Sequence, residues 1–108
     1  MTAPTDALVV LVTAPSPEKA AELARALVEE RLAACGNVVP GLRSIYRWEG
    51  ELHDDAEALL LLKTTRARFD ALRARVVELH PYDVPEVLAL PVEAGSAGTL
   101  AWIAAETA

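Results

Sequence analysis

The chain has 108 residues, and at this length we expect one domain, because domains cluster near about 100–150 residues. Hydrophobic residues make up 53% of the chain and aromatic residues 5%, which excludes a disordered chain and predicts a core of aliphatic side chains. Ten Lys and Arg against sixteen Asp and Glu give a net charge of -6. This charge repels phosphate backbones and anionic lipid, so we expect no nucleic-acid or membrane partner.

The cysteine content and the hydropathy pattern bear on the compartment. The single cysteine, Cys35, excludes an intrachain disulfide and a four-cysteine zinc site within one subunit. The N-terminal residues carry no basic segment of the kind that starts a signal peptide, and no apolar run approaches the roughly 20 residues of a membrane span. We therefore expect a cytoplasmic protein in a reducing environment.

The first part of the chain predicts a strand followed by a helix. Residues 1–7 are a short polar leader that we expect to be disordered, and the aliphatic run Leu8–Val12 is typical of a central strand. Ser16 followed by Pro17 is a helix start, because serine caps the first amides and proline tolerates the first helical position. Apolar residues then recur at helical spacing, which predicts a helix over residues 17–32.

The middle of the chain predicts a hairpin and a further strand. Residues 35–52 have strand character on both sides of Pro40-Gly41, which marks a bulge, bend or edge position, and a turn is expected at Glu49-Gly50. Residues 57–64 read as a strand, although their leucines also suit a helix.

The last part of the chain predicts two helices around a short strand. Thr64 or Thr65 opens a helix that ends before Pro81. A strand follows over residues 87–90, and the glycines at 95 and 98 lead into a short terminal helix.

This order, βαββαβ with a terminal helix, predicts a ferredoxin-like α+β sandwich. Two interleaved strand–helix–strand units form a four-stranded antiparallel sheet with both long helices on one face. The first and third strands are apolar at consecutive positions, so the other face would expose leucine and valine unless something covers it. Self-association is the simplest way to cover that face.

The hairpin holds two of the aromatic residues, Tyr46 and Trp48, on one side of a strand. They can form a local cross-strand cluster, or they can lie on a neighbouring subunit, where Tyr and Trp contribute strongly to interfaces. Charges of alternating sign could fix the register of the hairpin; these are Arg43, Arg47, Glu49 and Glu51.

Three polar elements could bind metal, and each has a structural alternative. Cys35 is a soft ligand, but a lone cysteine more often serves as a small buried hydrophobe. The segment His53-Asp54-Asp55 resembles a small metal site, yet a solvated turn before a strand explains it better. His80 lies at a helix end, where it can cap the terminal carbonyls.

A polar cleft is the functional alternative for His80. It would combine His80 with residues of the following loop and of the preceding strand, namely Tyr82, Asp83, Glu86, Glu57 and Lys63. Acid–base chemistry by Lys63, Glu57 and Tyr82 lacks a visible nucleophile–base pair, and no serine–histidine–acid order, phosphate loop or HExxH helix occurs. We therefore expect no enzyme.

Five stretches together resemble one known family, the CutA divalent-cation tolerance proteins. In chain order they are VTAPSPEKAAELARALVEERLAACGNVVP, SIYRWEGEL, EALLLLKT, ELHPYDVPEVLALP and GTLAWI. The resemblance extends from about Leu8 to Ile103 and implies a ferredoxin-like subunit in a homotrimer similar to the PII signalling proteins. It also implies a cytoplasmic role in metal-ion tolerance with copper binding and without a required cofactor.

The resemblance assigns residues to two groups. It implies polar positions near the subunit cleft at Cys35, Glu57, Lys63, His80 and Tyr82, and interface positions at Tyr46, Trp48 and Trp102. The sequence departs from the family where Gly36 replaces the usual valine, Glu51 the usual lysine and Asp83 the usual glutamate.

Two functions follow as expectations. The leading one is a trimeric metal-responsive protein with Cys35 and His80 as copper ligands, because thiolate and imidazole suit copper. The alternative is a PII-like small-molecule sensor or signalling scaffold that binds an anion or metabolite through Lys63 and signals to a protein partner of unknown identity.

Overall fold

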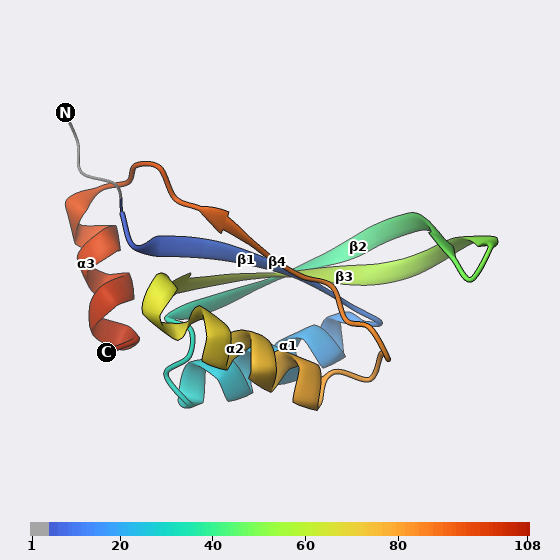
Figure 1. Cartoon of the computed structure of the whole chain (residues 1–108), viewed down its shortest axis with the longest axis horizontal. Coiled ribbons are helices and arrows are strands. Elements are labelled where there is room, and N and C mark those ends of the chain that lie inside the picture. The colour runs from blue at the N-terminus through green and yellow to red at the C-terminus, as the bar shows by residue number, and fades with distance from the viewer. Residues whose placement is uncertain (1–4) are drawn as a thin grey trace.

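The computed structural model describes residues 5–108 and consists of four strands and three helices. Figure 1 shows a sheet with α1 and α2 on one face, α3 at one end and a long hairpin projecting from the other end. In chain order the elements are β1 (Ala7–Ala14), α1 (Pro17–Glu29), β2 (Cys35–Trp48), β3 (Glu51–Thr65), α2 (Arg66–Leu79), β4 (Val87–Pro91) and α3 (Ala97–Glu106). Residues 1–4 of the expected leader lie outside the described residues, whereas Ala7 already belongs to β1.

The strands form an antiparallel sheet in the order β2-β3-β1-β4, which confirms the predicted ferredoxin-like arrangement. Alternate residues of β1 and β3 face the helices and are fully buried, among them Val10, Val12, Leu60 and Leu62. Leu23 and Leu27 of α1 and Leu72 and Val76 of α2 complete this core. Aliphatic packing between the sheet and two helices is therefore the main source of stability in the domain.

Gly36 of β2 lies close against helix α1. A Cβ atom at this position would lie 2.7 Å from Ala24 Cβ of α1 and 3.2 Å from a methyl carbon of Leu62. The absence of a side chain at Gly36 lets α1 lie directly against β2.

Helix α1 is shorter than predicted, because it ends at Glu29 rather than at residue 32. Arg31 adopts a left-handed conformation with φ 61°. The N–H groups of Arg31 and Leu32 donate to the carbonyls of Val28 and Leu27 at 3.1 and 2.9 Å, which is the Schellman pattern. The sequence did not reveal this helix end, because the left-handed residue after a helix is normally glycine rather than arginine.

The β2–β3 hairpin is longer than predicted, because β3 begins at Glu51 and not near residue 57. The register shifts between Val39 and Leu42, so the bulge expected at Pro40-Gly41 is confirmed. Glu49 and Gly50 both have positive φ, as a two-residue hairpin turn requires. Beyond the bulge most of the arm's side chains are exposed, so no burial pattern marks these residues as strand in the sequence.

Helix α3 packs across the end of the sheet where β1 begins. Ile103 is buried with Ala7 and Ala34 in a second, small cluster. Arg31 and Arg68 donate to the carbonyl oxygens of Ala105 and Thr107 at 2.8 and 2.6 Å, which satisfies carbonyls at the helix end. Helix α3 therefore covers one end of the sheet and not the long face opposite α1 and α2 (Figure 1).

Candidate functional site

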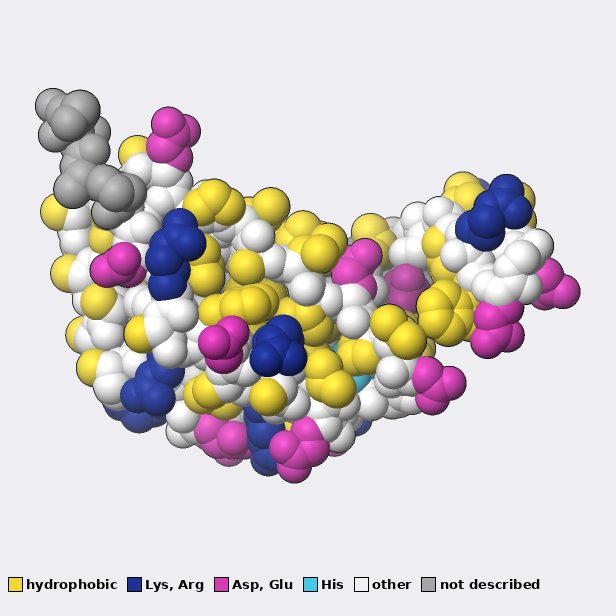
Figure 2. Space-filling model, in the orientation of Figure 1, with side chains coloured by type: hydrophobic (Ala, Val, Ile, Leu, Met, Phe, Trp, Pro, Cys, Tyr) yellow, Lys and Arg dark blue, Asp and Glu magenta, His cyan; other side chains and the backbone are white. Residues whose placement is uncertain are grey.

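A cleft of about 1030 Å³ lies where the hairpin leaves the body of the domain. Figure 2 shows the surface hollowed at this place, with acidic and hydrophobic side chains around the hollow. The hairpin contributes Tyr46, Trp48, Asp55 and Glu57, and the loop after α2 contributes residues 81–84 and 86. The fold therefore builds the cleft from one edge of the β2–β3 arm and the loop that connects α2 to β4.

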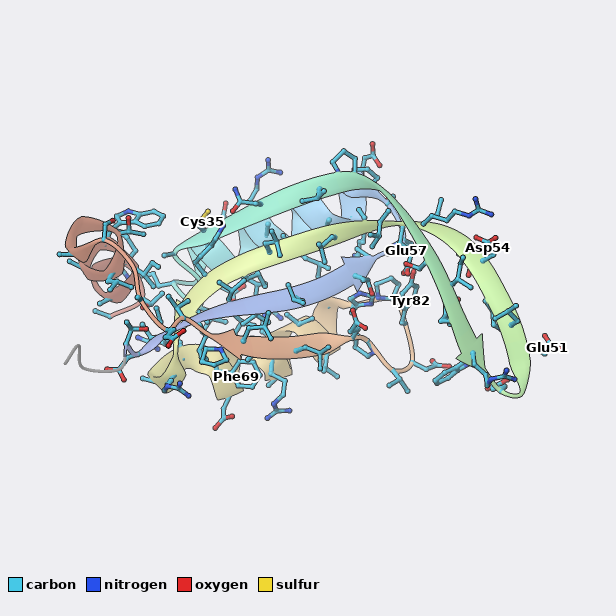
Figure 3. All side chains as sticks on the ribbon, turned by 90° about the horizontal axis from the view of Figure 1, so that it is seen from above. Cys35, Glu51, Asp54, Glu57, Phe69 and Tyr82 are labelled. Atoms are coloured by element: carbon cyan, nitrogen blue, oxygen red, sulfur yellow. The ribbon has the colours of Figure 1, made fainter. Side chains whose placement is uncertain are left out.

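Tyr82 joins the two sides of the cleft. Its hydroxyl donates a hydrogen bond to Glu57 Oε2 at 2.8 Å, and Figure 3 shows the two side chains together near the end of β1. Partial burial, followed by the bond to the Glu57 carboxylate, raises the pKa of the Tyr82 phenol above its ordinary value. The Tyr82 phenol therefore stays protonated at neutral pH and can donate this hydrogen bond.

His80 supports Tyr82 from the inside of the domain. The side chain of His80 is 7% exposed, and its ring lies 4.6 Å from the ring of Tyr82. The Tyr82 N–H donates to His80 Nδ1 at 3.2 Å, which leaves Nε2 as the protonated nitrogen; Nε2 donates to the Thr13 carbonyl at 2.7 Å. Both ring nitrogens are engaged, so metal binding by His80 would break one of these bonds.

Tyr46 forms a matching contact on the arm. Its hydroxyl donates to Asp55 Oδ2 at 2.6 Å, and its ring stacks on His53 with 5.0 Å between centroids. The hydrogen bond to Asp55 raises the pKa of the Tyr46 phenol. Asp55 and Glu57 are two positions apart and lie on the same side of β3, and each accepts a hydrogen bond from a tyrosine hydroxyl.

Arg43 and Asp54 form an ion pair across the two strands of the arm. Arg43 donates to both carboxylate oxygens of Asp54, from Nε at 2.8 Å and from a terminal nitrogen at 2.7 Å. This bidentate contact lowers the pKa of Asp54. The interpretation of His53-Asp54-Asp55 as a solvated turn is therefore wrong, since all three residues belong to β3 and each has a cross-strand partner.

The structure does not bring the predicted site residues to one place. Glu57, Tyr82, Asp83 and Glu86 line the cleft together. Lys63 lies at the opposite end of β3, where its Nζ donates to Asn37 Oδ1, so the expectation that it reaches into the cleft is wrong. Its neighbour across the strands is the half-buried Cys35.

Cys35 and His80 also lie apart within one chain. Cys35 pairs across the sheet with Lys63 and through it with Val9, whereas His80 contacts Thr13, four residues further along β1. At about 3.3 Å per residue, the two positions are offset by roughly 13 Å along the direction of β1. In residues 5–108 no group of three His, Cys, Asp or Glu side chains is arranged to hold a metal ion.

The predicted interface aromatics, Trp48 and Trp102, are both exposed, and Trp48 also lines the cleft. Sequence reasoning assigned Tyr46 to an interface and did not pair it with Asp55. The period-two spacing of residues 53, 55 and 57 could have indicated this arrangement, because such residues share one side of a strand. Thr13 gave no such signal, since it acts through its backbone carbonyl.

These features define a ferredoxin-like domain with an open sheet face, a projecting hairpin and a polar, aromatic cleft at the hairpin's base. The family model "CutA1 divalent ion tolerance protein" matches residues 8–106. The chain belongs to this family. No helix within the described residues has the length and hydrophobicity to cross a membrane.

Individual relatives agree with this assignment. The chain is 58% identical over 99 residues to the divalent-cation tolerance protein CutA of Thermus thermophilus, covering 92% of this chain and 96% of that protein. It is 48% identical to the chloroplastic protein CutA 1 of Oryza sativa, of which it spans 54%. A solved CutA structure from Xylella fastidiosa superposes with a TM-score of 0.93 at 38% identity, covering 96% of this chain and all of the other.

Proposed function

We propose that the chain acts in the cytoplasm as a homotrimer in the response to divalent cations. The observation that carries this proposal is the apolar face of the sheet opposite the helices. The cytoplasmic part rests on the single cysteine, which suits a reducing compartment; one related structure, from Archaeoglobus fulgidus, is described as periplasmic. The three-fold arrangement is the one that the family resemblance implies.

The open face is continuous across the strands. Leu11 of β1 pairs with Leu61 of β3 and with Leu88 of β4. Along β1, Leu11 alternates with the buried Val10 and Val12, which face the helices. The neighbouring positions extend the same face; they are Val9, Leu59, Val39 and Leu90. Figure 2 shows hydrophobic side chains grouped along this side of the body. An aliphatic surface of this kind favours association, because water is removed from it when copies pack together.

Sedimentation of two matched variants tests the assembly. Leu88 is 54% exposed on the open face, and Val77 is 49% exposed on α2. Leu88→Asp should leave the subunit folded but dissociate the trimer, because a buried unpaired charge is strongly unfavourable. Val77→Asp should remain a trimer. A wild-type chain that sediments as a monomer at micromolar concentration would refute the assembly.

Copper is the cation that we propose, with Cys35 as the soft ligand on the open face. Cys35 shares this face with Leu61 and Val9, so assembly decides which groups of neighbouring copies reach the thiol. His80 was the second ligand expected from the sequence, and its two hydrogen bonds favour a supporting role in the cleft instead.

Copper titration of three proteins separates these roles. Cys35→Ala should lose the tightest copper site, whereas His80→Ala should keep it and show lower stability. Equal copper stoichiometry and affinity in the wild type and Cys35→Ala would exclude the thiol as a ligand. Loss of copper binding in His80→Ala, in a variant that remains folded, would restore His80 as a ligand.

A second candidate function is a small-molecule sensor that acts through the cleft on a protein partner. The volume of the cleft, about 1030 Å³, favours this candidate, since it is at the upper end of the roughly 300–1,000 Å³ typical of ligand sites. Ligands that bind the folded state raise the melting temperature by mass action, so a thermal-shift screen would identify them. The absence of any shift across nucleotides, organic acids and amines would count against the sensor.

A further inference from the structure

We propose that the cleft at the base of the hairpin binds a linear polyamine, a chain of ammonium groups separated by short methylene segments. The inference rests on the second proposed function, because it assigns a ligand class to the same cleft. It also changes the expected charge of the ligand, from an anion bound by Lys63 to a cation.

The charge of the cleft is the first argument. Four carboxylates line it, from Asp55, Glu57, Asp83 and Glu86, against the single guanidinium of Arg43. Arg43 is already bound to both oxygens of Asp54. The ion pairs found among residues 5–108 involve other carboxylates than these four. The cleft therefore presents a negative potential that a cationic ligand would neutralise.

The orientation of the carboxylates is the second argument. Tyr46 and Tyr82 each donate to one carboxylate oxygen, of Asp55 and Glu57 respectively, so these two side chains are held in place before a ligand arrives. Neither contact neutralises the carboxylate, since the raised phenol pKa values keep the protons on the tyrosines. Two residues apart on one strand, the carboxylates are spaced by roughly 7 Å, which suits ammonium groups joined by a short chain.

The size and walls of the cleft are the third argument. A bare metal ion needs several ligands within about 2–2.6 Å, and the described residues contain no such cluster. The volume suits an extended molecule instead. Tyr46, Trp48 and Tyr82 supply aromatic surface that can pack against methylene groups and attract ammonium ions through their ring faces. A flexible polycation satisfies both the carboxylates and the aromatic walls.

Calorimetric titration of the full chain with spermidine at low ionic strength tests the inference. We expect saturable binding with one spermidine per chain. Glu57→Gln keeps an acceptor for Tyr82 but removes the charge, and should weaken binding by at least about fivefold. The matched control is Asp70→Asn, which removes the same charge from an exposed position on α2 and should bind within about twofold of the wild type.

Three results would overturn the inference. They are no saturable heat at millimolar spermidine, equal affinity in the wild type and Glu57→Gln, or displacement of spermidine by magnesium at equal charge concentration. The thermal-shift screen on the same protein distinguishes this failure from that of the proposed sensor. A chain that another compound stabilises but that does not bind spermidine refutes the polyamine site alone, whereas no shift with any compound counts against the sensor as well.

Discussion

The contact between Gly36 and α1 leads to a quantitative prediction for Gly36→Ala. The added Cβ would lie 2.7 Å from Ala24 Cβ. Carbon atoms in contact prefer about 3.5–4.0 Å, so β2 and α1 would have to separate by about 1 Å. Strain of this kind typically costs about 1–3 kcal/mol. The lower entropy of the unfolded alanine chain offsets about 0.4–1 kcal/mol of this cost. We expect a net loss of about 1–2 kcal/mol in the free energy of unfolding.

Urea denaturation at one fixed protein concentration measures this loss, because assembly makes stability depend on concentration. The control is Gly98→Ala in α3. In the described structure no heavy atom other than its chain neighbours and the nearby backbone of α3 lies within 4 Å of the Cβ position at Gly98. This substitution should stabilise the helix by up to about 1 kcal/mol. If Gly36→Ala is as stable as the wild type, the close approach of α1 to β2 is not a constraint and the reasoning fails.

Three further predictions concern the side chains around the cleft. Because both phenol pKa values are raised, the two tyrosines should ionise at higher pH in the folded chain than in urea, as absorbance at alkaline pH would show. Above about pH 10 the folded state then holds more protons than the unfolded state, so the free energy of unfolding should fall as pH rises. This fall should be less steep in Tyr82→Phe. Identical tyrosine titration in the folded and unfolded states would contradict the prediction. A double-mutant cycle on Arg43 and Asp54 should give a small favourable coupling energy that weakens as salt is added. The coupling should disappear at acid pH, where the Asp54 carboxylate, whose pKa is lowered, becomes protonated. A coupling energy that changes with neither salt nor pH would be inconsistent with an exposed ion pair. His80→Ala leaves the Thr13 carbonyl without its buried donor and should lower the unfolding free energy by about 1–3 kcal/mol in urea melts, whereas an unchanged melt would show that water replaces the ring.

The core of the domain could be predicted from the sequence because its pattern is simple. Alternating burial along β1 and β3 and helical spacing in α1 follow directly from which side chains must leave water. The Ser16 cap is confirmed by the bond from the Lys19 N–H to Ser16 Oγ at 3.1 Å. The projecting arm could not be predicted in full, since most of its side chains are exposed and carry no burial signal.

The cleft was predictable in part. The structure brings together four of the residues that the sequence placed around one cleft, namely Glu57, Tyr82, Asp83 and Glu86. Lys63 was misplaced, since six residues of extended chain separate it from Glu57 by roughly 20 Å. The supporting role of His80 depends on backbone groups of Thr13 and Tyr82, which a pattern of side chains does not reveal.

The bulge at Pro40-Gly41 has a mechanical consequence. The arm beyond it is a two-stranded ribbon without a layer beneath, and a bulge is where a ladder bends and twists most easily. We therefore expect bending to concentrate at the bulge and displacement to be largest at the tip, Glu49-Gly50. Glu57 pairs with Leu42 beside the bulge, so it lies close to the point where the arm bends and we expect it to move least. The tip of the arm can thus change position to contact a neighbouring molecule while the Glu57 carboxylate at its base keeps its geometry.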